Sequence, residues 1–152
     1  MKAYNSILFP TDFSHCSDQA IEEVCNLAQT LGAELHLLHV VEPIDIYSTR
    51  YGTEQALYFD LMKQMRAGAT EDMNILKEKL SARGLHPVSV VLEGKPEDEI
   101  VKYASEQGMS LVCMSTHGWS GLKHLLLGST TERVLRHAPC PVFVLRCGTS
   151  VS

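Results

Sequence analysis

Short apolar runs alternate with longer segments of helical periodicity along the chain, and turn residues separate them. The short runs are continuous rather than alternating, which is typical of strands buried on both faces of a parallel sheet. Five such strands are expected, at Ser6–Pro10, Glu34–Val41, Val88–Glu93, Leu111–Ser115 and from Pro141 to Arg146. Strands that alternate with helices predict an α/β fold.

Residues at helical spacing fill the segments between these strands. Gly32 and Gly84 stand where the first two helices should end, because glycine readily adopts the left-handed conformation that closes a helix. Pro96 and the acidic residues after it suit the start of the third helix. The helices are expected from about residue 17 to 32, at 53–83 and 96–108, and at Ser129–His137 with a serine cap.

The second helix is the longest, and it carries apolar residues at helical spacing along its whole length. These residues are Leu57, Leu61, Met65, Met73, Leu76 and Leu80. Two connections are also long: residues 42–52 after the second strand and residues 116–128 after the fourth strand. Strand-to-helix loops in α/β folds usually have two to six residues, and longer ones are usually functional.

The chain length fits one domain. With 152 residues, 45% of them apolar, residues 1–152 can bury a substantial core. Five strands of this doubly wound type are expected in the order 3-2-1-4-5, in a single-domain open parallel sheet with helices on both faces.

Charge and hydropathy exclude several partners. The formal charge is −5, from 13 basic and 18 acidic residues spread along the chain, so no basic patch for nucleic acid or an anionic membrane is visible. No apolar run approaches the roughly 20 residues of a membrane span. Residues 1–10 lack a signal-peptide pattern, so a soluble, cytoplasmic protein is expected.

The five cysteines have no pair at two-residue spacing, which argues against a zinc knuckle or a redox dithiol. Reduced and mostly buried thiols are therefore expected. Cys113 lies within an apolar run and fits the core. Cys16 lies near a helix start, where a thiolate is favoured, but a surface position without a chemical role is the simpler interpretation.

Candidate chemistry lies just after the strands, because ligands of open parallel sheets bind at the carboxyl ends of the strands. Asp12 follows the first strand, and Ser115 ends the fourth. The loop after Ser115 leads through Gly118 to Gly128 and then to three successive hydroxyl residues, Ser129, Thr130 and Thr131. Glycine backbone, helix N–H groups and hydroxyls together form a suitable cradle for phosphate.

Each of these residues also has a simpler interpretation. In that interpretation the glycines only form turns, and Ser129 only caps its helix. A P-loop is absent, because no glycine is followed by Lys and then Ser or Thr, and no dinucleotide fingerprint follows the first strand. The phosphate hypothesis therefore rests on the set of residues taken together.

The chain resembles the universal stress protein superfamily of UspA, in its ATP-binding form, over nearly its whole length. The matching segments are residues 7–14, residues 37–41, and Gly94 with Pro96 and Ile100. The family's ATP motif is Gly, two residues, Gly, nine residues, then Gly followed by Ser or Thr. Gly118, Gly128 and Ser129 match it, and Ser115 stands where the family has its first glycine.

The resemblance implies an adenine nucleotide site, with ATP, ADP or AMP as ligand. It implies that Asp12 and the Val41 backbone lie at the adenine with Pro10 and Thr11 beside them. The residues implied at the ribose and phosphates are Met114, Ser115, His117, Gly118, Gly128, Ser129, Thr130 and Thr131. Asp12 could instead hold Mg²⁺ against the phosphates, or cap the first helix.

Three functions remain open. The first is an ATP-binding regulatory or stress-response protein that changes conformation or protein partner with occupancy. The second is an enzyme that hydrolyses ATP or transfers a phosphate, although no base with an orienting partner is visible beside the glycine loop. The third is a scaffold whose pocket stays empty. The sequence favours the first, with slow ATP hydrolysis at most.

The fifth strand predicts a homodimer. In the order 3-2-1-4-5 this strand lies at an edge, and Pro141 to Arg146 contains four consecutive apolar residues without a charge among them. Antiparallel pairing with a second copy would cover both edges at once. The resemblance implies the same interface, and the alternative is a monomer whose C-terminal tail covers the edge.

Overall fold

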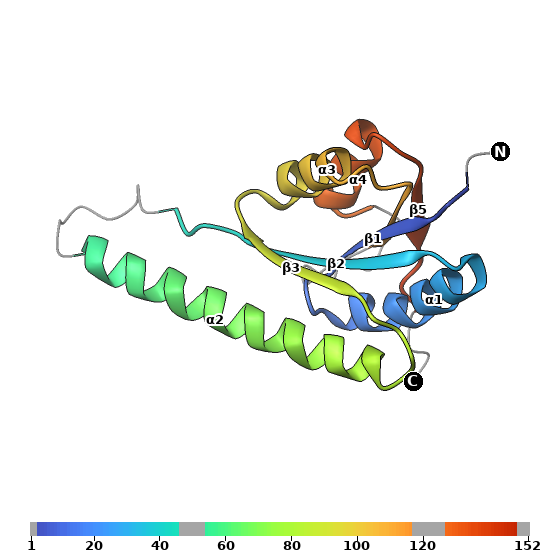
Figure 1. The fold of residues 1–152 in the computed structure, drawn as a ribbon. Coiled ribbons are helices and arrows are strands. Elements are labelled where there is room, and N and C mark those ends of the chain that lie inside the picture. Colours follow the sequence, from blue (N-terminus) through green and yellow to red (C-terminus); the bar gives the residue numbers. More distant parts are fainter. Residues whose placement is uncertain (1–2, 46–53, 117–126, 149–152) are drawn as a thin grey trace.

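A computed structural model of the protein describes residues 3–45, 54–116 and 127–148. Its centre is one sheet of five parallel strands in the order β3-β2-β1-β4-β5 (Figure 1). The strands are β1 Ser6–Pro10, β2 Glu34–Val41, β3 Val88–Glu93, β4 Leu111–Ser115 and β5 Val142–Leu145. The predicted α/β class and strand order are confirmed.

Helices cover both faces of this sheet (Figure 1). They are α1 His15–Leu31, α2 Glu54–Ser81, α3 Pro96–Glu106 and α4 Ser129–His137. Helices α1 and α2 lie on one face, and α3 and α4 lie on the other. This layering places the starts of α1 and α4 near each other, because both helices follow the carboxyl ends of neighbouring strands.

The two faces of the sheet have separate cores. In β1, Ile7 and Phe9 point toward α1 and α2, whereas Leu8 points toward α3 and α4, and all three are fully buried. This alternation follows from the period of two along a strand. A sheet covered on both sides needs apolar residues at every position, which explains the continuous apolar runs in the sequence.

The element boundaries differ from the expected ones by a few residues. Helix α1 begins at His15, two residues early, because Ser14 is its cap and accepts a hydrogen bond from the Ser17 N–H at 3.3 Å. Helix α4 is capped by Gly128 rather than by a serine, since the Gly128 carbonyl already accepts the Glu132 N–H at 3.0 Å. Both differences concern helix starts beside the strand ends.

Helix α2 differs from its apolar pattern in the first half. Leu57 is 67% exposed, and Leu61 and Met65 are also exposed, whereas Met73 and Leu80 in the second half are buried. Figure 1 shows the reason: the first half of α2 extends beyond the end of the sheet. Its apolar residues therefore have little of the sheet to pack against.

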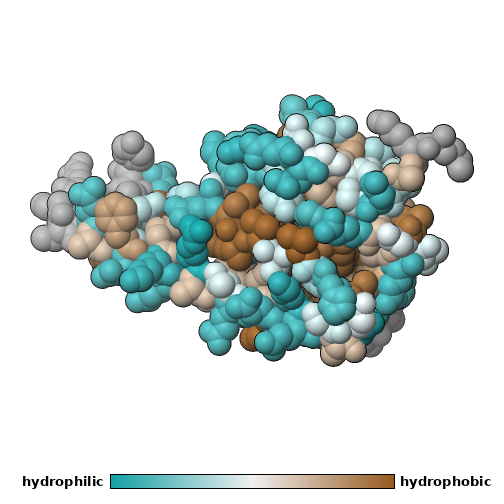
Figure 2. All heavy atoms as spheres, viewed as in Figure 1, coloured by the Kyte–Doolittle hydropathy of each residue, from teal (hydrophilic) through white to brown (hydrophobic). Residues whose placement is uncertain are grey.

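Hydrophobic residues also reach the surface beside the edge strand β3. Figure 2 shows them gathered between the layer of α3 and the layer of α2. Val90, Val91 and Leu92 of β3 are half-buried. In the part of the chain that is described, no helix combines the length and the apolar character needed to cross a membrane.

Candidate functional site

A cleft of about 450 Å³ lies at the carboxyl ends of β1, β2 and β4. Its size is within the range of pockets that hold small molecules. The start of α4 forms one wall of the cleft, and residues of α2 and α3 complete it. The lining residues are Pro10, Thr11, Asp12, Ser17, Leu38, His39, Val40, Val41, Glu42, Met65, Pro96, Ile100, Met114, Ser115, Gly128, Ser129, Thr130 and Thr131.

The structure brings most of the sequence-predicted residues together in this cleft. Those that line it are Pro10, Thr11, Asp12, Val41, Met114, Ser115, Gly128, Ser129, Thr130 and Thr131. The other two, His117 and Gly118, lie outside the described residues. The expected meeting of three strand ends at one edge of the sheet therefore occurs.

The wall formed by α4 presents backbone donors to the cleft. Gly128 is the helix cap, and its own N–H donates to the Thr116 carbonyl at 2.9 Å. The next three N–H groups, at Ser129, Thr130 and Thr131, lie in the first turn, where a helix provides no carbonyl acceptor. Together with the helix dipole, such donors favour an anion.

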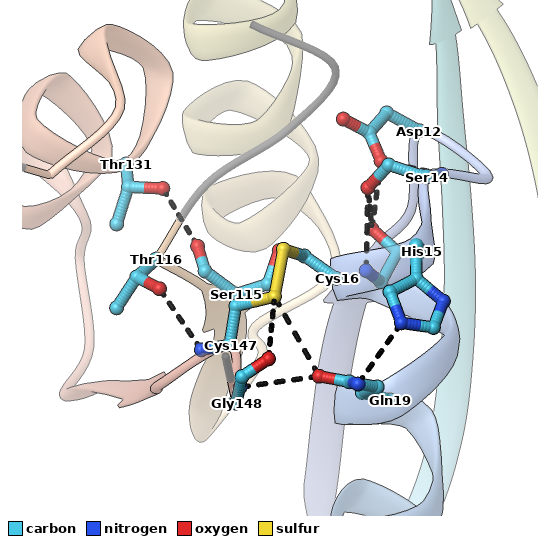
Figure 3. Close-up of a disulfide and its surroundings, with 11 residues drawn as sticks. Asp12, Ser14, His15, Cys16, Gln19, Ser115, Thr116, Thr131, Cys147 and Gly148 are labelled. Atoms are coloured by element: carbon cyan, nitrogen blue, oxygen red, sulfur yellow. Dashed lines mark hydrogen bonds between the residues drawn. A yellow bond between two sulfur atoms is a disulfide. The ribbon is translucent and has the colours of Figure 1, made fainter. Parts of the chain in front are cut away.

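Thr131 has a different position from its two neighbours. Its side chain is buried, and its hydroxyl donates to the Ser115 carbonyl at 3.0 Å. This hydrogen bond ties the first turn of α4 to the end of β4 (Figure 3). The three hydroxyls proposed for an anion are therefore reduced to two, Ser129 and Thr130, while Thr131 holds the helix start in place.

Asp12 lies on the opposite side of the cleft, in the loop between β1 and α1. Its Oδ1 accepts the Ser14 N–H at 3.0 Å and the Ser17 hydroxyl at 2.8 Å. These bonds support the helix-capping interpretation of Asp12, because they fix the first turn of α1. They also hold the carboxylate in one orientation at the cleft.

The same loop is held by His39 of β2, which is not among the predicted site residues. The His39 Nδ1 lies 2.8 Å from the Thr11 carbonyl, so this nitrogen carries the hydrogen. The Phe13 ring lies on the His39 ring with centroids 4.7 Å apart. Phe13 has φ of 58°, a strained value for a bulky residue, so the surrounding structure must hold its backbone there.

Eight lining residues were not among the predicted site residues: Ser17, Leu38, His39, Val40, Glu42, Met65, Pro96 and Ile100. His39 and Glu42 stand beside Val41, so the end of the second strand was the available signal. Met65 reaches the cleft from α2, and no sequence signal indicates which residue of a long exposed helix does so.

No metal cluster accompanies these residues. Across residues 3–45, 54–116 and 127–148, no three His, Cys, Asp or Glu side chains are grouped so that they could hold a metal ion. A magnesium ion often needs fewer protein ligands, because it keeps water and binds substrate phosphates beside one or two carboxylates. Asp12 and Glu42 are the carboxylates that line the cleft within this part of the chain.

The expectation of reduced thiols is wrong for two of the cysteines. Cys16 and Cys147 form a disulfide, with Cα atoms 5.1 Å apart and a sequence separation of 131 (Figure 3). Cysteine spacing along the chain does not predict this bond, because only the fold brings the start of α1 next to the end of β5. Cys25 and Cys113 are buried free thiols, as expected, and burial raises the pKa of Cys113 to about 12.

These features define an α/β protein with a candidate anion-binding cleft at the strand ends. A model of the universal stress protein family matches residues 3–146, and the chain belongs to this family. It is 31% identical to the universal stress protein MJ0577 of Methanocaldococcus jannaschii, over 94% of this chain and 95% of that protein. It is 29% identical to YxiE of Bacillus subtilis, over 94% and 99% of the two chains.

Solved structures have the same fold. The structure of MJ0577 matches with a TM-score of 0.85 and 32% identity, over 98% of this chain and all (100%) of that chain. UspA of Lactobacillus plantarum matches with a TM-score of 0.84 and 26% identity, over 96% and 100%. Universal stress proteins solved with cAMP and, from Archaeoglobus fulgidus, with dAMP are 20% and 16% identical, each with a TM-score of 0.63. At this level of identity, these two structures show only that the fold is shared.

Proposed function

We propose that the protein binds an adenine nucleotide in the cleft, with ATP as the principal ligand, and regulates a protein partner according to occupancy. The observation that carries the proposal is the first turn of α4, because its residues Ser129 and Thr130 line the cleft and supply N–H groups and hydroxyls there. Donors at a helix start suit phosphate oxygens. ADP and AMP are the alternative ligands of the same site.

The rest of the cleft suits the less polar part of a nucleotide. Val41, Ile100 and Met114 provide apolar lining, and the Val41 backbone stands at the end of β2. In the proposal the base lies toward Thr11 and Val41, and the ribose lies near Met114 and Ser115. The relatives solved with cAMP and dAMP indicate that the fold can accept adenine nucleotides in other proteins.

Magnesium belongs to the proposal as a partner of the phosphates. Asp12 would hold the ion together with phosphate oxygens and water, and the ion would neutralise part of the triphosphate charge. The carboxylate is suited to this, because the bonds from Ser14 and Ser17 to its Oδ1 already fix its orientation.

A homodimer through β5 is the proposed assembly. The Val112 N–H donates to the Pro141 carbonyl, and the Thr116 N–H donates to the Leu145 carbonyl. Successive residues of a strand point their backbone N–H and carbonyl groups to opposite sides. The N–H and carbonyl groups of Val142 and Val144 therefore point to the open side of β5. The Phe143 side chain on this strand is 49% exposed. A second copy of the chain could therefore pair with β5 and extend the sheet.

We also propose a cytoplasmic location for the protein.

The test is a nucleotide analysis of the purified protein. Nucleotide retained through purification should be identified as ATP, ADP or AMP by mass spectrometry, and calorimetric titration of stripped protein with ATP and Mg²⁺ should show saturable binding. GTP is the matched control for recognition of the base. Stripped, folded protein that binds no adenine nucleotide at millimolar concentration would overturn the proposal and favour an unliganded scaffold.

A further inference from the structure

The disulfide joins the two sides of the cleft. Cys16 is the second residue of α1, which follows the Asp12 loop, and Cys147 lies just beyond the end of β5. Both cysteines are only half-buried, so a small thiol or disulfide reagent can reach them. Figure 3 shows the bond between the start of α1, beside Asp12, and Cys147 in the segment after β5, which lies next to Ser115 and Thr116 at the end of β4.

The Cys147 side of the bond is connected to the start of α4. The Cys147 N–H donates to the Thr116 Oγ1 at 3.1 Å. The backbone of Thr116 accepts the Gly128 N–H at 2.9 Å and donates to the Leu145 carbonyl at 2.9 Å. Thr116 therefore ties together the segment after β5, the end of β4 and the cap of the helix that forms the anion-binding wall.

The Cys16 side is connected to Asp12. Cys16 lies between His15 and Ser17 in the first turn of α1, and the Ser17 hydroxyl donates to the Asp12 Oδ1 at 2.8 Å. The Ser14 N–H donates to the same oxygen at 3.0 Å. A covalent bond at Cys16 thus restrains the turn that orients the Asp12 carboxylate.

We propose that Cys16 and Cys147 are a reversible redox pair whose disulfide strengthens nucleotide binding. The coupling half of this inference rests on the proposed function, whereas the redox half stands independently. The disulfide fixes the Asp12 side of the cleft against the Thr116 and Gly128 side, so the oxidised cleft is organised before the ligand arrives. Less freedom is then lost on binding, and the affinity rises.

The chemistry needs a disulfide or a dithiol as co-reactant. In oxidation, the Cys16 thiolate attacks a sulfur of oxidised glutathione, and one glutathione thiolate leaves. The Cys147 thiolate then attacks Cys16 Sγ in this mixed disulfide and expels the second glutathione. Two electrons pass from the cysteine sulfurs to glutathione, and the two cysteine protons end on the two glutathione thiols.

Acceptors for a reduced Cys147 thiol lie close to its sulfur. The Cys147 thiol would find two acceptors within reach, the Gln19 Oε1 at 3.6 Å and the Gly148 carbonyl at 3.9 Å (Figure 3). Cys16 lies in the first turn of α1, where the helix dipole favours the thiolate that attacks. In a reducing compartment, accessible disulfides are usually transient or redox-sensing rather than permanent.

The experiment follows the redox state and the affinity in the same samples. The full-length protein is equilibrated in oxidised or reduced glutathione, and free thiols are alkylated and located by peptide mass spectrometry. ATP with Mg²⁺ is then titrated by calorimetry into each sample. Cys16→Ser and Cys147→Ser remove the bond, and Cys140→Ser is the matched control, because Cys140 is a half-buried cysteine outside the disulfide. Circular dichroism checks that each variant folds.

The expected result is a Cys16–Cys147 peptide that appears and disappears with the buffer, together with an affinity roughly fivefold or more higher in the oxidised state. Both serine variants should lose this response, and Cys140→Ser should keep it. If a serine variant does not fold, the wild-type response and the Cys140→Ser control still decide the result.

The proposal would be overturned if Cys16 and Cys147 never form the disulfide, or if the oxidised and reduced proteins bind ATP with equal affinity. Absence of nucleotide binding in both states would refute the proposed function and the coupling, while the peptide would still report the redox pair.

Discussion

Gly128→Val is the substitution that separates binding from folding most cleanly. A Cβ at this position would meet the Thr116 carbonyl at 3.5 Å, which is an ordinary contact, and no other described atom within 4 Å. The φ of Gly128 is −57°, so a side chain causes no backbone strain there. The loss of a favourable cap residue should cost only about 1 kcal/mol of stability.

The effect on nucleotide binding should be much larger. A valine side chain at the cap would occupy the open space before the first turn of α4, where the phosphates are proposed to bind. Hydrogen bonds to charged groups contribute about 1.5–3 kcal/mol each, so displacement from two N–H groups removes about 3–6 kcal/mol. A loss of about 3 kcal/mol already lowers affinity by more than roughly a hundredfold.

Calorimetric titration with ATP and Mg²⁺ measures this loss, and thermal unfolding of the same samples measures stability. Gly68→Val is the matched control, because Gly68 lies in α2 with nothing within 4 Å of an added Cβ. The control should bind ATP as the wild type does. Unchanged ATP affinity in folded Gly128→Val would refute the assignment of the phosphates to this helix start.

Three further predictions concern the hydroxyls, the chemistry and the assembly. Ser129→Ala should weaken ATP binding by about 0.5–1.5 kcal/mol, the value of one neutral hydrogen bond, which titration resolves from the larger loss at Gly128. Hydrolysis should be very slow, and a coupled assay that finds ADP release near the typical enzyme rate of about 10 per second would favour an enzyme instead. Val144→Pro should give monomers in light scattering, because it removes an N–H on the open side of β5, whereas Ser89→Pro on the opposite edge strand β3 should leave the dimer intact. A dimer that survives Val144→Pro would exclude this interface.

The sequence predicts the fold well, because strands buried on both faces of a sheet appear in it as short continuous apolar runs. Every residue from Ile7 to Phe9 is buried, and glycines such as Gly32, with φ of 62°, mark the helix ends. Periodicity does not reveal where a helix leaves the body of the protein. For that reason, the exposure of Leu57 and Met65 in α2 was not predicted.

The predicted residues that line the cleft lie at strand ends or at the start of α4. Asp12 and Ser115 lie at strand ends, and both line the cleft. The role of His39 was not predicted, because its contact with the Thr11 carbonyl joins β2 to the loop after β1 and arises only in the fold. The Cys16–Cys147 disulfide was missed for the same reason, since the two residues meet only through the folded topology.

A crystal structure of the protein grown with ATP and Mg²⁺ tests the central proposal most directly. The account predicts phosphate density within hydrogen-bond distance of the N–H groups of Ser129 and Thr130, with the base toward Thr11 and Val41. Nucleotide density elsewhere on the protein, or an empty cleft at an ATP concentration that saturates the protein in solution, would contradict it.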